Sequence, residues 1–171
     1  LVNLIGHELH HSYRWGYLRE KYKDSGSPVA AALSMMQSEG CADILNKLEG
    51  PYSMKDAGLF GEDVLKQMNE NYYNTPKLLQ KIDSLTVGYS KGTVDADVYG
   101  QVAKLPVNGG HPNGFYMATL IKHQLGLQAI VDNSVEPGMF VETYNKAAGD
   151  EYVFTDEFVA YVKQQYKLME K

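Results

Sequence analysis

Cysteine is almost absent from this sequence of 171 residues: Cys41 is the only one, so the chain cannot form an internal disulfide. An excess of positive charge is also lacking, since 16 basic and 21 acidic residues give a formal net charge of −5. Proteins that bind nucleic acids usually carry a basic face, so we expect no nucleic-acid partner. No apolar run approaches the roughly 20 residues of a membrane span. These absences leave a folded domain that is held together by its core alone.

The start of the sequence lacks a charged segment followed by an apolar one, so no signal peptide is visible. The chain opens with Leu1 rather than Met, and its first residues already read as a helix. We therefore expect residues 1–171 to be a single domain at the C-terminal end of a longer protein. The content of 44% hydrophobic and 22% charged residues is typical of a globular domain and does not indicate a compartment.

Apolar residues recur at helical spacing along most of the chain, and no strand-like alternation is evident. Ser27-Pro28 and Thr75-Pro76 each place a capping residue before a proline, which is typical of a helix start. Gly50-Pro51 predicts the end of the second helix. Residues 87–110 contain five glycines and predict a long connection. The sequence predicts a mainly α fold with helices over residues 1–23, 28–49, 62–73, 75–85, 96–104, 113–124, 137–148 and 156–169.

The first predicted helix contains the sequence His7-Glu8-Leu9-His10-His11, which has the pattern H-E-x-x-H. Residues four apart share one face of a helix, so His7 and His11 can bind one metal ion together. Glu8 lies at the edge of that face, where its carboxylate can take a proton from a water molecule. Pairing of His7 with His10 is an alternative, but it would leave Glu8 farther from the metal. A surface helix with clustered histidines is the simplest non-functional interpretation.

A catalytic zinc site needs a third protein ligand, and the second predicted helix offers one in Glu39-Gly40-Cys41-Ala42-Asp43. Glu39 and Asp43 share a face, so Glu39 can bind the metal while Asp43 accepts a hydrogen bond from a ligand histidine. Small residues, Gly40 and Ala42 on this helix and Gly6 on the first, would let the two helices approach. Cys41 points away from Glu39, and we interpret it as a buried apolar residue.

These residues resemble the gluzincin metallopeptidases, zinc enzymes of the thermolysin type. That family carries H-E-x-x-H on one helix and E-x-x-x-D on a following helix, matched here by His7, Glu8, His11, Glu39 and Asp43. An uncharacterised bacterial family of zinc-dependent peptidases is the closest resemblance and would cover nearly the whole chain. The resemblance implies a helical zincin-like catalytic lobe with one Zn²⁺ ion. It also implies a sheet lobe upstream that is absent from these residues and would complete the substrate cleft.

A third block supports the resemblance: residues 108–114, with His111 inside, are similar to the N-G-G-x-H-x-N-x-G stretch of thermolysin-like enzymes, one residue shorter before the histidine. In that family the histidine donates a hydrogen bond to the developing oxyanion, and the resemblance assigns this role to His111. The family carries an acid just before N-G-G that orients the histidine, whereas this chain has Val107 there. Tyr116, early in the helix that follows, is a second candidate donor, although a tyrosine at such a position is more often a core aromatic.

We therefore predict a zinc-dependent hydrolase of peptide bonds in peptide or protein substrates. His7, His11 and Glu39 would bind the metal, Glu8 would act as general base, His111 would stabilise the oxyanion and Asp43 would orient a ligand histidine. Two alternatives stay open: a metal-bearing binding or scaffold module derived from a peptidase, and a zinc amidase that acts on a non-peptide amide.

Overall fold

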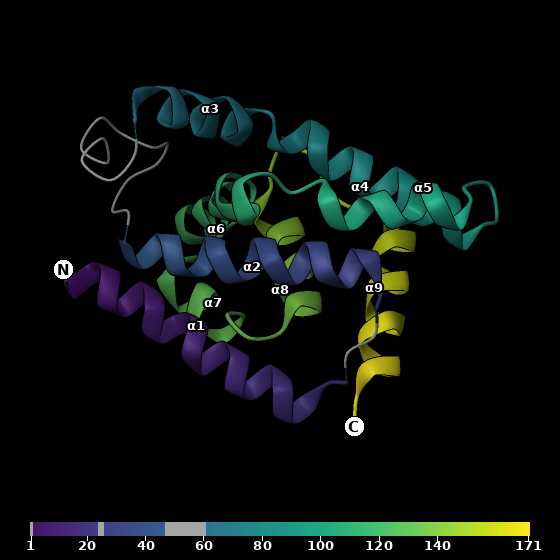
Figure 1. Ribbon diagram of the computed structural model, residues 1–171, viewed down its shortest axis with the longest axis horizontal. Coiled ribbons are helices and arrows are strands. Elements are labelled where there is room, and N and C mark those ends of the chain that lie inside the picture. The colour runs from purple at the N-terminus through teal and green to yellow at the C-terminus, as the bar shows by residue number, and fades with distance from the viewer. Residues whose placement is uncertain (1, 24–25, 47–60) are drawn as a thin grey trace.

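A computed structural model describes residues 2–23, 26–46 and 61–171 (Figure 1). Over these residues the fold is mainly α, as predicted, and it contains no strand; Tyr22 and Glu170 form an isolated β-bridge. None of the described helices combines the length and the apolar character that a bilayer crossing requires. The helices are α1 (Val2–Lys21), α2 (Pro28–Asn46), α3 (Glu62–Tyr73), α4 (Thr75–Ser90), α5 (Ala96–Gly100), α6 (His111–Leu125), α7 (Leu127–Asp132), α8 (Pro137–Ala147) and α9 (Asp156–Met169), with short 3-10 turns η2 (Gln101–Lys104) and η3 (Asn108–Gly110).

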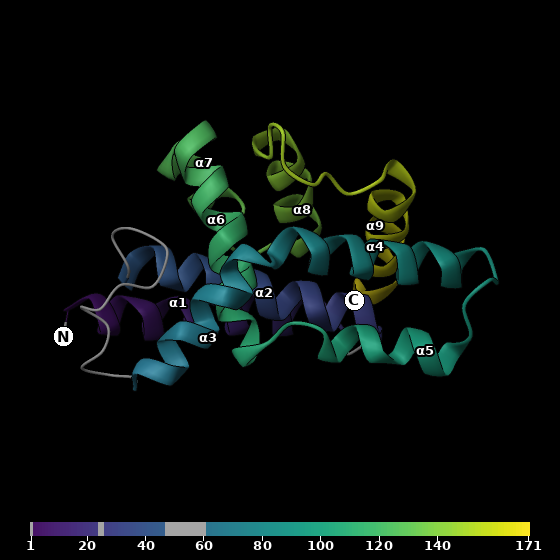
Figure 2. The ribbon, with the colours of Figure 1, turned by 90° about the horizontal axis from the view of Figure 1, so that it is seen from above.

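Helix α2 runs through the centre of the molecule and packs most extensively against α6 and α1 (Figure 1). Its first turns are made almost entirely of small and apolar residues, and Val29, Ala32, Leu33 and Met36 are all buried. A helix that is apolar on most of its sides belongs in the core, where it can meet neighbours all round. Figure 2 shows α6, α7 and α8 extending to one side of α2, with α1 running beside it. Helix α2 therefore serves as the frame on which the other helices are placed.

Two glycines bring α6 into backbone contact with α2. A Cβ atom added at Gly114 would lie 1.8 Å from the carbonyl oxygen of Met36, and one added at Gly40 would lie 2.2 Å from the carbonyl oxygen of Gly114. Real Cβ atoms do not come this close, so both positions require glycine. The contact places the start of α6, which carries His111, beside the half of α2 that carries Glu39 and Asp43.

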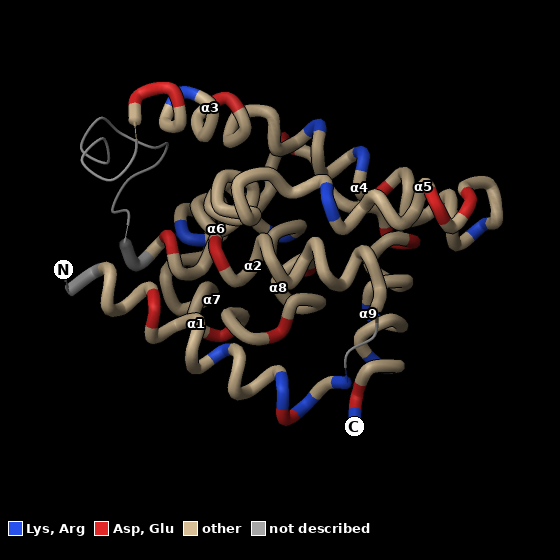
Figure 3. The backbone as a smooth tube through the Cα atoms, viewed as in Figure 1, with Lys and Arg blue, Asp and Glu red and all other residues tan. Residues whose placement is uncertain are grey.

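Charge is unevenly distributed along α1. Figure 3 shows basic residues in its C-terminal half, and Arg19 and Lys21 lie in its last turn. Basic side chains in this position interact favourably with the negative end of the helix dipole. At the same end, Glu136 accepts hydrogen bonds from Tyr17 and Lys21, both at 2.6 Å, which ties α1 to the start of α8. The histidines of α1, by contrast, lie in its N-terminal half.

Several helix limits differ from those predicted. Helix α4 continues to Ser90 rather than ending near residue 85, and Gly88 within it allows Val94 to pack closely, since a Cβ there would lie 2.6 Å from Val94 Cγ2. Thr75 is already helical: Asn74 is the N-cap, and the Thr75 hydroxyl donates to the Asn71 carbonyl oxygen. Helix α6 starts at residue 111, two residues earlier than predicted, and α7 was not predicted. The predicted end of the second helix at residues 50–51 lies outside the described residues.

Candidate metal centre

Three side chains from α1 and α2 converge on one point. The Nε2 atoms of His7 and His11, one turn apart on α1, lie 3.1 Å from each other. Glu39 approaches from α2, and its Oε2 atom lies 3.7 Å from His7 Nε2 and 3.3 Å from His11 Nε2. The structure therefore brings together the three residues that the sequence predicted as metal ligands, and they form a group able to bind a metal ion.

The spacing of these three atoms fits zinc. Ligand atoms at about 2.0–2.1 Å from a tetrahedral zinc ion lie roughly 3.3–3.4 Å from one another. The observed separations of 3.1, 3.3 and 3.7 Å bracket this value. Two imidazoles and one carboxylate are also a common ligand set of catalytic zinc sites, which keep the fourth position open. The residues present thus suit zinc in both chemistry and geometry.

The other ring nitrogen of each histidine faces α2. His11 Nδ1 is hydrogen-bonded to the hydroxyl oxygen of Ser38 at 2.9 Å. His7 Nδ1 faces Asp43 Oδ1 at 3.6 Å, which is longer than a hydrogen bond. The hydrogen bond with Ser38 fixes the orientation of the His11 ring, and the Nε2 atoms of both histidines face Glu39. Ser38 was not singled out in the sequence, because a serine next to Glu39 carries no motif.

Burial differs across the cluster. The His7 side chain is 9% exposed, whereas those of His11, Glu39 and His111 are 26%, 21% and 32% exposed. Burial lowers the pKa of His7, and the nearby Asp43 carboxylate opposes this only in part. A lowered pKa favours the neutral imidazole, which is the form that binds a metal. The cluster therefore has a buried back formed by His7 and a solvent-facing side formed by the other residues.

His111 joins this cluster from α6. Its Nε2 atom lies 3.2 Å from Glu39 Oε2, and its Nδ1 atom is hydrogen-bonded to Asp43 Oδ2 at 3.0 Å. Its ring stacks on that of His7, with centroids 5.9 Å apart and an angle of 16° between the planes. Gly109 and Gly110, with φ angles of 69° and 89°, form the turn that delivers His111 to this place. The structure thus brings His111 of the 108–114 segment next to the H-E-x-x-H motif of α1 and the E-x-x-x-D motif of α2.

Glu8 and His10 flank the ligands on α1. Glu8 directly follows His7 and is exposed to solvent. His10 lies outside the group formed by His7, His11 and Glu39, and its ring packs against that of His11 with centroids 5.8 Å apart. Burial, with the positive charges of His11 and Arg14 adding to it, lowers the pKa of His10 to about 4. The alternative pairing of His7 with His10 is therefore not the one that the structure assembles.

Two other candidates are buried residues. Tyr116 is buried against Tyr72, and burial together with the nearby Glu151 raises its pKa. Cys41 is buried, as expected, and burial raises the pKa of its thiol to about 12. The expected roles of Gly6 and Gly40 in the approach of α1 to α2 were wrong. A Cβ at Gly6 would meet nothing within 4 Å, and Gly40 lies against the Gly114 backbone of α6 instead.

A buried polar network, not anticipated from the sequence, fixes α1 against α2 one turn beyond His11. The Arg14 guanidinium donates to Gln37 Oε1 at 2.7 Å and to Ser34 Oγ at 2.9 Å. Arg14 and Gln37 are 5% and 0% exposed, so these charge-assisted bonds replace water that neither side chain can reach. In the sequence, the sign of this network is Arg14 on the helix face that bears His7 and His11. An arginine in that position is equally consistent with a solvent-exposed side chain, so the network could not be predicted.

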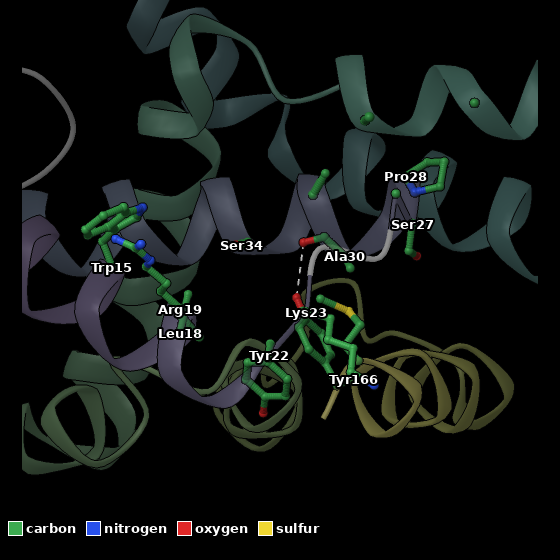
Figure 4. Close-up of a pocket in the computed structure, with 15 residues that line it drawn as sticks. Trp15, Leu18, Arg19, Tyr22, Lys23, Ser27, Pro28, Ala30, Ser34 and Tyr166 are labelled. Atoms are coloured by element: carbon green, nitrogen blue, oxygen red, sulfur yellow. Dashed lines mark hydrogen bonds between the residues drawn. The ribbon is translucent and has the colours of Figure 1, made fainter. Parts of the chain in front are cut away.

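A cavity of about 530 Å³ opens farther along the same two helices. It is lined by the second half of α1, the start of α2 and the end of α9, and Figure 4 shows Trp15 at one side and Tyr22 and Tyr166 at another. The Tyr166 hydroxyl donates to the Ala30 carbonyl oxygen at 3.1 Å, and the Arg19 guanidinium lies 5.1 Å from the centre of the Trp15 ring. None of the three candidate ligands lines this cavity, so it is separate from the metal centre.

Comparison with known proteins assigns the chain to a family. The model of a family described as "Putative zinc dependent peptidase (DUF5700)" matches residues 1–151. No curated protein and no solved structure matches the chain. The matched range includes the three candidate ligands as well as Asp43 and His111.

Proposed function

The chain belongs to this family of zinc-dependent peptidases, and on that premise we propose that it hydrolyses peptide bonds with one zinc ion held by His7, His11 and Glu39. The observation that carries the proposal is the triangle of ligand atoms, with sides of 3.1, 3.3 and 3.7 Å. The arrangement of H-E-x-x-H on α1 and the third ligand on α2 supports assignment to the gluzincin type.

The chemistry divides between the metal and the protein. When bound, zinc would lower the pKa of a water molecule and polarise the carbonyl of the peptide bond. Glu8, exposed beside His7, accepts the proton of this water as its oxygen attacks the carbonyl carbon. The bond from carbon to nitrogen then breaks, and Glu8 passes the proton to the leaving amine.

His111 acts on the carbonyl oxygen of the substrate. Its side chain is 32% exposed and its Nε2 atom lies 3.2 Å from a Glu39 oxygen, which supports a position beside the carbonyl of a bound peptide. A ring N–H held there before the reaction begins can donate to the oxygen as negative charge develops on it. Removal of a donor of this kind typically costs about 10²–10³ in kcat.

Glu8→Gln in the full-length protein tests the proposal. We expect this variant to bind one zinc ion per chain like the parent, because Glu8 is not among the ligands. Hydrolysis of a mixed peptide library should fall by about 10²–10⁴, the usual contribution of a general base. Glu20→Gln, the same change at an exposed position of the same helix, is the matched control and should cleave like the parent. Activity of Glu8→Gln within tenfold of the parent would remove Glu8 from the mechanism, and zinc binding without any turnover in the parent would favour a binding module.

A further inference from the structure

The Asp43 carboxylate lies behind the cluster and is 0% exposed. Its two oxygens face histidines from two different helices: Oδ1 lies 3.6 Å from His7 Nδ1, and Oδ2 lies 3.0 Å from His111 Nδ1. The shorter contact, and the only one of the two within hydrogen-bond range, is made to the histidine that is not a candidate ligand. Asp43 therefore does more than face a metal ligand.

We propose that Asp43 is a shared positioning residue that holds His111 for the substrate and supports the metal ligand His7. The inference rests on the proposed function, because the task of His111 is defined there. The position directly before the turn at Asn108–Gly110 is occupied by Val107, whose side chain has no hydrogen-bond acceptor. Its backbone N–H is directed instead to Asn113 Oδ1, at 3.3 Å. The acceptor for His111 is thus supplied from α2 rather than from its own loop.

The geometry explains how one carboxylate can serve two rings. The rings of His7 and His111 are stacked with an angle of 16° between their planes, so their Nδ1 atoms can face the same group. On the opposite edge, His7 Nε2 and His111 Nε2 lie 3.7 Å and 3.2 Å from Glu39 Oε2. Asp43 and Glu39 thus lie on opposite sides of the ring pair. The hydrogen bond at Nδ1 fixes the His111 ring, while the other Asp43 oxygen faces His7 Nδ1 without reaching hydrogen-bond distance, so the Nε2 atoms of both rings are directed towards Glu39.

Asp43→Asn separates this arrangement from one in which Asp43 serves His7 alone. An asparagine has nearly the same volume but is uncharged and offers one acceptor oxygen, so it cannot present an acceptor to both rings. We expect kcat/KM to fall about 100-fold in the parent and zinc affinity to fall about tenfold. In a His111→Ala background the same substitution should lower kcat/KM less than tenfold, because the part that acts through His111 is already lost. The fall in zinc affinity should be equal in both backgrounds.

A readout independent of turnover is the ring N–H signal of His111 in NMR spectra of the protein with labelled histidines. The parent should show a hydrogen-bonded Nδ1 proton for His111, identified by its loss in His111→Ala, and Asp43→Asn should remove or shift it. Asp83→Asn is the matched control, since Asp83 is also a buried carboxylate and accepts from Thr155 and Tyr152 away from the cluster. It should lower stability but leave zinc affinity, the His111 signal and the kcat/KM of the folded protein unchanged.

Equal loss of kcat/KM in both backgrounds, together with an unchanged His111 signal in Asp43→Asn, would overturn the inference. If the parent cleaves no peptide, the proposed function fails, and the NMR signal alone then decides the inference. Persistence of that signal in Asp43→Asn would show that another group holds His111. Its loss, with the signal retained in Asp83→Asn, would support Asp43.

Discussion

Gly114→Ala tests whether the backbone contact between α2 and α6 sets the position of His111. The new Cβ atom would lie 1.8 Å from the Met36 carbonyl oxygen and 2.8 Å from the Gly40 nitrogen, all of it backbone that cannot rotate away. To restore a contact of about 3 Å, α6 must move away from α2 by about 1 Å. The hydrogen bond from His111 to Asp43, now 3.0 Å, would then lengthen to about 4 Å and be lost.

Two losses of different size should follow from this movement. Overpacking typically costs about 1–3 kcal/mol of unfolding free energy, which urea unfolding can measure. The kcat/KM should fall by about 10²–10³, the usual effect of losing an oxyanion donor. Zinc affinity, measured by competition with a chelator, should stay near that of the parent, because the three ligands belong to α1 and α2.

Gly16→Ala is the matched control, because a Cβ at Gly16 in α1 would meet nothing within 4 Å. It should stabilise the protein by up to about 1 kcal/mol, the difference in helix propensity between the two residues, and leave kcat/KM unchanged. If Gly114→Ala were as stable and as active as Gly16→Ala, the reasoning about the α2–α6 contact would be refuted.

Two further predictions concern the supports of α1. Ser38→Ala removes the partner of His11 Nδ1 and should weaken zinc affinity about 10–100-fold, as measured by competition with a chelator. The unfolding free energy of the zinc-free protein should change little, and an unchanged zinc affinity would contradict an orienting role for Ser38. Burial raises the pKa of Glu136, but hydrogen bonds from Lys21 and Tyr17 outweigh this effect and hold the pKa below its usual value. The ionised carboxylate therefore stabilises the folded protein above about pH 4.5, and this contribution is lost as the pH falls further. Glu136→Gln should therefore lower the unfolding free energy by about 1–3 kcal/mol at pH 7 and by less at pH 3, whereas an equal loss at both pH values would exclude the charge as the cause.

Local signals predicted the helices well where the chain has a clear start. The last helix runs from residue 156 to residue 169 as predicted, and the Thr155 hydroxyl caps it by accepting from the Phe158 N–H at 3.2 Å. Glycine was a poorer guide, because it can end a helix or permit close packing. Gly88 looked like part of a connection but lies inside α4 against Val94. Helix α7 was missed because it is short, mostly exposed and separated from α6 only by Gly126.

The candidate site divides in the same way between local and long-range information. The spacing of His7 and His11 is local, and helix geometry alone places both on one face. Glu39 lies on a second helix, so helix geometry alone could not place it near the histidines, but the E-x-x-x-D motif identified it as a candidate ligand. The bond between His111 and Asp43 joins residues 68 apart, and it depends on how two glycines let α6 approach α2. Nothing in the spacing of the sequence encodes that distance, so the sequence assigned Asp43 to a ligand histidine alone.

Two turns of α2 make most of the contacts that shape the site. Between residue 37 and residue 43, Gln37 meets Arg14 of α1, Ser38 meets His11 and Glu39 meets the candidate ligand histidines. Gly40 then meets the backbone of α6, and Asp43 faces the pair of stacked histidine rings. Any displacement of this segment would move the candidate ligand Glu39 together with Ser38, the partner of His11, and Asp43, the partner of His111. The proposed metal binding and the proposed carbonyl recognition therefore both depend on this one segment of α2. For this reason we expect substitutions in the core beneath it, such as Met36→Ala, to impair zinc affinity and kcat/KM in parallel, whereas Gly114→Ala on α6 separates the two.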